Sequence, residues 1–294
     1  MKWIIDKQHD KTLLREYLID VRGFSKRTLA TVKHQGGKIL VNNEPKTVRY
    51  ILSENDTVEV IFPPEKRSEY ILPEPLPLDI IYEDDDVLVI NKPPNMATIP
   101  SRHHPGRTLA NAILYHYDQN QLPYTVHVVT RLDRDTSGLL LIAKHRYSHA
   151  IMFREQQSGK VNRTYQAIVS GIPQPKEGRI NKPIARDPDS ILKRMVDNAG
   201  QEAITNYRVM EVWKQYSLVE ISLETGRTHQ IRVHLTDMGH PLAGDRLYGG
   251  SLDHIGRQAL HCTELAFYHP MTRKRMSFTL PLAEDLAKIK QTEI

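Results

Sequence analysis

The sequence predicts an α+β fold, in which a small module of helices and a β-hairpin precedes a larger domain built on a mixed or antiparallel sheet. Three observations lead to this prediction. Eight segments beyond residue 77 have strand character and only two have helical character, so strand and helix do not alternate as in a doubly wound fold. Neither common glycine-rich phosphate loop occurs. A proline- and charge-rich linker, 64–77, separates domain 1–63 from domain 78–294.

The first domain has the elements of a compact α/β module. The helical spacing of its apolar residues predicts a helix over 12–19. Side-chain capping, glycine at a helix end and an Asn-Asn turn locate the elements that follow. In order, these are a helix over 26–34 capped by Ser25 and ended by Gly36-Gly37, a strand over 38–41, a tight turn at Asn42-Asn43 and a strand over 57–62.

The second domain is strand-rich, because β-branched and aromatic residues fill most of its apolar segments. Strands are expected over 87–91, 125–129, 139–143, 163–169, 203–213, 217–223, 229–235 and 259–268, and helices over 108–116 and 147–157. As a strand, the segment 229–235 places Gln230, Arg232 and His234 on one face and the residues between them on the other.

Composition limits the class of protein. The 294 residues carry a formal net charge of +5, which favours a polyanionic partner without requiring one. A single cysteine, Cys262, excludes a disulfide within the chain and any zinc site with two or more thiolates, and it favours a reducing compartment. No apolar run is long enough to span a membrane. A cytoplasmic monomer without a membrane partner is the expectation.

A basic surface is predicted in the first domain. Between Arg22 and Arg49 there are seven positive residues and one negative residue, which leaves six net positive charges in 28 residues. Such a face attracts phosphate groups, although a solvated helix face explains the same charges. The candidate RNA-binding residues are Arg22, Lys26, Arg27, Lys33 and Lys38.

The most informative segment is Val129–Leu141, where a charged loop with Thr, Ser and Gly lies between two apolar strands. Rigid strands thereby hold Arg131, Asp133, Arg134 and Asp135 at one end of a sheet, a suitable place for chemistry. From charge pattern alone, a loop whose carboxylates and arginines merely pair, without a function, is the favoured interpretation.

The exact strings resemble known families. Arg-Leu-Asp-Arg-Asp-Thr-Ser-Gly at 131–138 resembles the catalytic motif of the RluA family of pseudouridine synthases, and further motifs of that family follow in its order. These lie at 89–94, 163–167, 224–235, 239–245 and 248–249. Separately, 12–62 resembles the RNA-binding domain shared with ribosomal protein S-four. The resemblances imply isomerisation of uridine to pseudouridine in structured RNA, without a cofactor or metal.

The resemblance also implies roles for particular residues. Asp133 matches the catalytic aspartate, Tyr165 the tyrosine that packs on the uracil ring and acts as a candidate base, and Arg232 the arginine that pairs with the aspartate. Arg131 matches the arginine that displaces the target base from its stack. Thr130 departs from the family, which usually has histidine there. The segment 100–105 is also longer than usual and is a candidate substrate-contacting loop.

The reaction needs an ionised, oriented carboxylate, which can attack the anomeric carbon, add to carbon 6 of uracil or help to remove a ribose proton. We therefore expect Arg232 to lie within ion-pair reach of Asp133 and to favour its charged form. Large-subunit ribosomal RNA is the favoured substrate, and transfer RNA the alternative. Two rival functions remain at this point: a metal-dependent nuclease using some of the 14 histidines, and a non-catalytic RNA-binding or ribosome-assembly factor.

Overall fold

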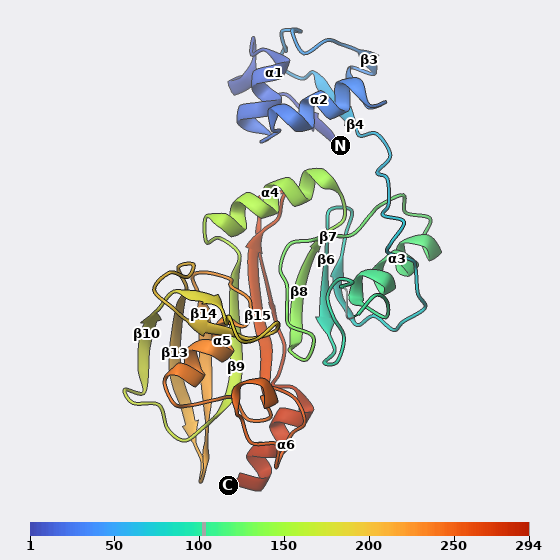
Figure 1. Cartoon of the computed structure of the whole chain (residues 1–294). Coiled ribbons are helices and arrows are strands. Elements are labelled where there is room, and N and C mark those ends of the chain that lie inside the picture. The colour runs from blue at the N-terminus through green and yellow to red at the C-terminus, as the bar shows by residue number, and fades with distance from the viewer. Residues whose placement is uncertain (102–103, 294) are drawn as a thin grey trace. The chain divides into compact units, whose positions relative to one another are not determined.

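The structure, a computed structural model, describes residues 1–101 and 104–293 and divides into two compact units (Figure 1). The first unit comprises Met1–Ser68 with Gln121–Thr125, and the second comprises Glu69–Asn120 and the chain from Val126 onward. The division falls inside 64–77, and the domain boundaries proposed at 63 and 78 stay a prediction. Within the described ranges, no helix has both the length and the apolar character needed to cross a membrane.

The first unit contains a four-stranded antiparallel sheet in the order β1-β4-β2-β3, accompanied by short helices. Helix α2 begins as predicted, because Ser25 Oγ accepts the N–H of Thr28 at 2.9 Å. Asn42 and Asn43 have φ of 52° and 66°, the left-handed geometry of a tight hairpin turn. The elements are β1 (Lys2–Ile4), η1 (Lys7–His9), α1 (Leu14–Glu16), η2 (Tyr17–Val21), α2 (Lys26–His34), β2 (Lys38–Val41), β3 (Glu44–Pro45) and β4 (Thr57–Ile61).

The second unit contains a large mixed sheet, as predicted. Its strand order is β10-β13-β14-β9-β15-β8-β6-β5, with β16 paired to β15 and β7 paired to β8, and only the β15–β8 pair is parallel among these described strands. The strands are β5 (Ile80–Glu83), β6 (Val87–Lys92), β7 (His127–Val128), β8 (Ser137–Ala143), β9 (Asn162–Ser170), β10 (Glu177–Asn181), β13 (Ile204–Val212), β14 (Tyr216–Leu223), β15 (Leu260–Tyr268) and β16 (Arg275–Thr279).

Helices and a small hairpin complete the second unit. Helix α4 lies across one end of β8 and β15, and α3 lies beside the end of the sheet formed by β6 and β5 (Figure 1). Helix α6, which the sequence analysis did not predict, packs Leu286 and Ile289 against Trp213 and Ile168. These elements are α3 (Leu109–Gln119), β11 (Ile184–Arg186), β12 (Arg194–Val196), α4 (Arg146–Gln157), α5 (Gln230–Asp237), η3 (Arg246–Tyr248) and α6 (Glu284–Glu293).

The centre of the sheet is buried on both faces. All seven residues of β8 are buried, which explains its nearly continuous apolar sequence. Gly138 pairs with Cys262 of β15 at φ +109°, and a side chain on Gly138 would collide with the Cys262 backbone. The glycine of the 131–138 motif therefore lets β15 approach β8 directly behind the charged loop.

One predicted strand is wrong: residues 230–237 form the helix α5, with His229 as its N-cap at φ +58°. Apolar residues alternate along this segment, which suggested a strand. The polar residues between them are equally buried, however, with Gln230 at 3%, Arg232 at 6% and His234 at 0% exposure. A helix surrounded by protein on all sides shows no apolar face, so the alternation carried no information about the secondary structure.

Candidate active site

The loop between β7 and β8 is held in place by hydrogen bonds from buried side chains to its backbone carbonyls. Lys92 Nζ donates to the carbonyl of Arg134 at 2.9 Å, and Thr98 Oγ1 donates to the carbonyl of Leu132 at 2.9 Å. Lys92 is fully buried, and burial lowers the pKa of its ammonium to about 7. Because the carbonyls on either side of Asp133 are both held, its carboxylate projects from a rigid support.

Thr130, which departs from the family pattern, is 1% exposed and does not line the cavity described below. Its Oγ1 accepts the N–H of Leu141 at 3.0 Å, and its own N–H donates to the Leu141 carbonyl at 3.2 Å. The side chain thus joins the start of the loop to β8. The other departure, the segment 100–105, includes residues 102 and 103, which lie outside the described residues.

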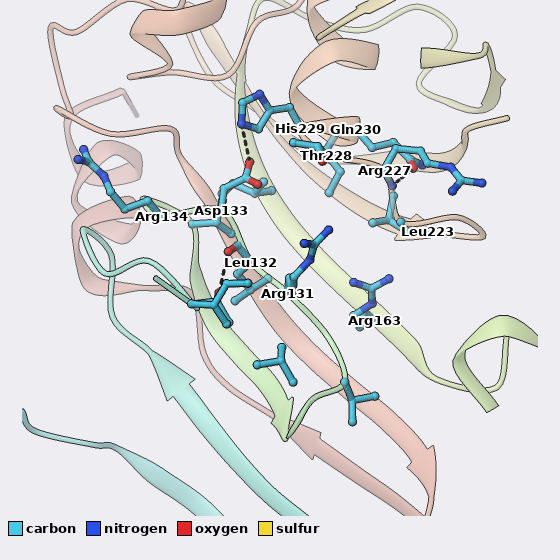
Figure 2. A pocket seen from close by; sticks show the side chains of 18 of the residues that line it. Arg131, Leu132, Asp133, Arg134, Arg163, Leu223, Arg227, Thr228, His229 and Gln230 are labelled. Atoms are coloured by element: carbon cyan, nitrogen blue, oxygen red, sulfur yellow. Dashed lines mark hydrogen bonds and ion pairs between the residues drawn. The ribbon is translucent and has the colours of Figure 1, made fainter. Parts of the chain in front are cut away.

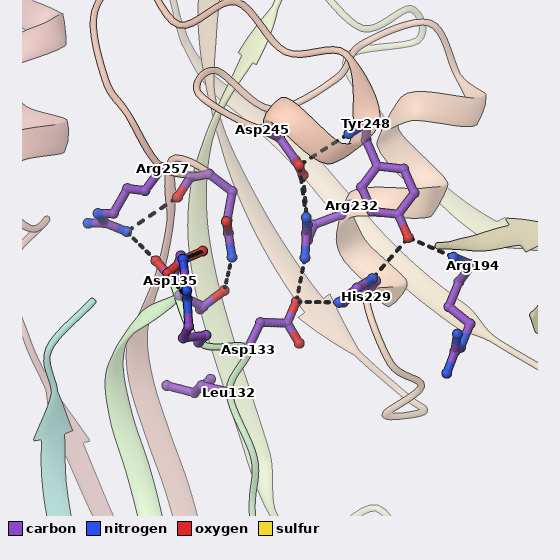
Figure 3. A network of polar contacts seen from close by, with 12 residues as sticks. Leu132, Asp133, Asp135, Arg194, His229, Arg232, Asp245, Tyr248 and Arg257 are labelled. Atoms are coloured by element: carbon purple, nitrogen blue, oxygen red, sulfur yellow. Dashed lines mark hydrogen bonds and ion pairs between the residues drawn. The ribbon is translucent and has the colours of Figure 1, made fainter. Parts of the chain in front are cut away.

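Arg232 lies between two carboxylates (Figure 3). Its Nη1 is 3.2 Å from Asp133 Oδ2, as the sequence analysis expected. Its Nε and Nη2 also donate to both oxygens of Asp245, at 2.7 and 2.9 Å. Burial lowers the pKa of Arg232, but the hydrogen bonds and charges of Asp245 and Asp133 outweigh it and raise that pKa above its ordinary value. The guanidinium is therefore a fixed positive charge beside Asp133.

Asp245 and His229 are neighbours of this pair that the sequence analysis did not assign to the site. Asp245 is 1% exposed and follows Gly244, whose φ of +73° allows the turn into η3. Both residues belong to the strings that resemble the family, at 239–245 and 224–235, and membership of those strings was the signal that could have identified them.

His229 approaches Asp133 from the N-terminus of α5, with Nε2 3.9 Å from Oδ2 (Figure 3). Its Nδ1 is 3.0 Å from the Tyr248 hydroxyl, which also accepts the backbone N–H of Arg194 at 2.9 Å. Either atom can be the donor in the contact between Nδ1 and the Tyr248 hydroxyl, and in both cases this contact orients the ring with Nε2 towards Asp133. Burial lowers the pKa of His229 and so favours the neutral imidazole, while the charge of Asp133 opposes this shift.

The side chain of Asp133 lines a cavity of about 580 Å³. Arg131 and Arg163 point into this cavity, between the charged loop and the segment Arg227–Gln230 (Figure 2). Five arginines line the cavity and Asp133 is the one carboxylate among its described lining residues. Such an excess of positive charge suits a polyanionic substrate, while the single negative group stands where a reaction could occur.

Tyr165 lines the same cavity from β9 and is 3% exposed. Its hydroxyl accepts a hydrogen bond from Arg163 Nη1 at 3.3 Å. Burial raises the pKa of Tyr165, so the phenol stays protonated at neutral pH. This environment favours packing of the ring against a substrate and opposes removal of a proton by the phenolate.

The basic residues of the first unit lie on and beside α2. Lys26, Arg27, Lys33 and Lys38 are exposed. Arg22, in contrast, is partly buried and donates to the Tyr17 hydroxyl, with its guanidinium stacked over the Tyr17 ring. The structure therefore presents four of the five predicted residues to solvent, and their contact with RNA stays a prediction.

One group of described residues, Asp84, Asp86 and His269, is close enough to hold a metal ion. The His269 Nδ1 accepts the backbone N–H of Met271 and of Thr272, so the ring hydrogen is on Nε2, 2.9 Å from Asp84. A protonated Nε2 cannot be a metal ligand, and none of the three residues lines the cavity. These contacts describe a hydrogen-bonded network that links β5, β6 and the end of β15.

The second unit thus combines a mixed sheet with a cavity in which one carboxylate lies beside a fixed arginine and four further arginines, an arrangement that suits an enzyme with a polyanionic substrate. A family model described as RNA pseudouridylate synthase matches residues 86–237. "Uncharacterized RNA pseudouridine synthase YjbO" of Bacillus subtilis is 49% identical over 280 residues, covering 95% of this chain and 99% of the relative. The chain belongs to the RNA pseudouridylate synthase family and is an isomerase.

Further relatives support the same assignment. "Ribosomal large subunit pseudouridine synthase D" of Haemophilus influenzae is 38% identical over 248 residues, covering 80% of this chain and 76% of the relative. Among solved structures, human RNA pseudouridylate synthase domain containing 1 matches with a TM-score of 0.59 at 24% identity, covering 74% of this chain and 94% of that chain. At this identity the structural match shows the fold alone.

Proposed function

We propose that this pseudouridine synthase modifies uridines in large-subunit ribosomal RNA, with Asp133 as the reacting carboxylate. The contact that supports this role is the 3.2 Å approach of Arg232 to Asp133, with Arg232 itself held by two bonds to Asp245. The choice of RNA is supported by the names of several relatives, which act on the large ribosomal subunit.

The chemistry exchanges one bond for another. The bond from N1 of uracil to the anomeric carbon breaks, the base turns, and a bond from carbon 5 to the same carbon forms. A proton leaves carbon 5 and N1 ends protonated, so no atom or electron is lost. Asp133 is the candidate nucleophile or base, and Arg232 provides an opposite charge beside it.

The target uridine must leave its stack to reach Asp133, whose side chain is 26% exposed. We propose that Arg131 fills the vacated space and that the Tyr165 ring packs on the uracil, since both side chains line the cavity that contains Asp133. The first unit, proposed to be an S-four-type domain, adds affinity for folded RNA through the exposed cations of α2. We propose a monomer in the cytoplasm.

Pseudouridine mapping tests this proposal. Total RNA is mapped from cells that lack the protein and from the same cells complemented with wild type, Asp133→Asn or Asp135→Asn. Asp135 is a matched control, because it belongs to the same loop but pairs with Arg134 and does not line the cavity. We expect a ribosomal uridine to regain its modification with wild type and with Asp135→Asn only. Restoration by Asp133→Asn would favour a non-catalytic role, and a site in transfer RNA would correct the substrate.

A further inference from the structure

Three aromatic rings form a row, and two of them line the active-site cavity. His127 of β7 stacks on His149 of α4, with ring centroids 5.3 Å apart and an interplanar angle of 29°. The His149 ring is in turn 6.1 Å from Phe153, at 34°. His149 and Phe153 are four residues apart on α4, so they share one face of the helix, and both line the cavity.

Phe153 ends this row and is 48% exposed. An exposed phenylalanine leaves a large apolar surface in water, at a cost that burial against a partner would remove. Here the ring is not isolated on a polar surface: His149 supports one side of it, and the cavity that contains Asp133 extends to it. This arrangement favours a flat partner that enters the cavity together with the substrate.

The charges in the same cavity indicate the chemistry of that partner. Arg131 and Arg163 line the same cavity, and among the described residues no carboxylate lies within ion-pair distance of either guanidinium. Arg163 Nε is also buried without a hydrogen-bond partner in the described part of the chain. Two arginines without acidic partners complement phosphate groups, and an aromatic face in the same cavity as such groups suits a nucleotide.

We propose that the Phe153 ring is a stacking site for an unpaired nucleobase of the RNA, adjacent to the target uridine, with Arg131 and Arg163 near its phosphates. The inference rests on the proposed function, because it takes the target uridine to lie at Asp133. A base can stack on Phe153 only after it leaves its own stack, so the enzyme prefers a uridine in a loop, bulge or single strand whose neighbour is also unpaired. Stacking tolerates any base, so this site distinguishes unpaired from paired RNA but does not distinguish one base from another. Sequence specificity must come from other contacts.

Binding of a fluorescent RNA tests the site without requiring turnover. The probe is a short single-stranded RNA with one uridine between two 2-aminopurines, whose emission rises when a base leaves its neighbours in the strand and falls when it stacks on an aromatic ring. Full-length wild type, Phe153→Ala, Phe153→Trp and Gln157→Ala are titrated into it. Gln157 is the matched control, because it is exposed on the same helix and does not line the cavity.

Wild type, Phe153→Trp and Gln157→Ala are expected to quench the probe alike. Phe153→Ala is expected to bind roughly 5- to 100-fold more weakly and to lose the quenching. Equal binding and equal probe emission with Phe153→Ala and with wild type overturn the stacking site. So does a loss of self-association in Phe153→Ala with unchanged probe binding, which would make a second copy of the chain the occupant.

The two proposals fail separately. If mapping finds no uridine whose modification depends on Asp133, but Phe153→Ala still binds the probe more weakly than wild type, the stacking site stands and the proposed function fails. If mapping succeeds and Phe153→Ala binds the probe as wild type does, only the stacking site is lost. Thermal unfolding confirms that each variant is folded, and rescue by Phe153→Trp shows that an aromatic face is the property required.

Discussion

Replacement of Asp245 by asparagine tests whether Arg232 must be rigidly held for the reaction. Asp245 is 1% exposed and accepts hydrogen bonds from Arg232 at 2.7 and 2.9 Å. Asparagine has nearly the same shape, but it offers one acceptor oxygen and an amide nitrogen that faces the guanidinium donors with donors of its own. Arg232 is therefore expected to lose one of its two anchors, and with it the geometry of its 3.2 Å contact with Asp133.

We expect the single-turnover rate of Asp245→Asn to fall about 100-fold, since a displacement of about 1 Å in a positioned group has that effect. The free energy of unfolding is expected to fall by about 3 kcal/mol, the lower end of the cost of breaking a buried ion pair. The affinity for RNA should change little, because Asp245 does not line the cavity.

The assay is single-turnover conversion with enzyme in excess over an RNA transcript that contains the mapped uridine, and thermal unfolding reports the folded fraction. Asp237→Asn is the matched control, since this carboxylate ends α5 but pairs with Lys182, outside the cavity. A folded Asp245→Asn protein with a rate within about threefold of wild type would refute the idea that Asp245 positions Arg232.

Three further predictions follow from individual contacts. Thr130→Val keeps the buried volume but removes the acceptor of the Leu141 N–H. The free energy of unfolding, measured in urea, should therefore fall by about 1–3 kcal/mol. A fall below about 0.5 kcal/mol would contradict this prediction. Tyr165→Phe should retain activity with an unaltered pH profile between about pH 6 and 9, because burial raises the pKa of Tyr165 and keeps the phenol protonated over that range. If the substitution instead removes a rise in activity on the alkaline side of the profile, Tyr165 acts as a base. The double substitution Lys26→Glu and Lys33→Glu should weaken RNA binding. The slope of the logarithm of the binding constant against the logarithm of salt concentration should become shallower by about one unit per lost phosphate contact. An unchanged slope would show that the RNA binds elsewhere.

The part of the site that could be predicted from sequence is the part that is continuous in sequence. Asp133 and Arg131 lie in one loop and Gly138 lies in the strand that follows it, and the charged stretch between two apolar strands already indicates a carboxylate at a sheet end. The pairing of Arg232 with Asp133 was expected from the family resemblance, and the 3.2 Å contact confirms that geometry. The catalytic roles of these residues stay predictions until they are measured.

The fold was predictable where a local pattern had one explanation. Capping by Ser25 and the Asn42-Asn43 turn depend on hydrogen bonds and φ angles within a few residues, so they appear where expected. The segment 229–235 failed because its polar residues are satisfied by distant groups: Gln230 donates to Ile204 and Thr205. When polar residues are as buried as apolar ones, periodicity no longer reports which side faces the core.

By itself, the sequence determined an α+β chain with a proline-rich break, a strand-loop-strand segment presenting Asp133, and, through resemblance, membership of a family of RNA-modifying isomerases. Only the tertiary structure decided that Asp245 holds Arg232, that His229 faces Asp133, and that Phe153 borders the same cavity. These decisions depend on distances between residues separated by 13 to about 100 positions, which are set by packing and burial. Local propensity depends on a few neighbouring residues and therefore cannot predict these long-range distances.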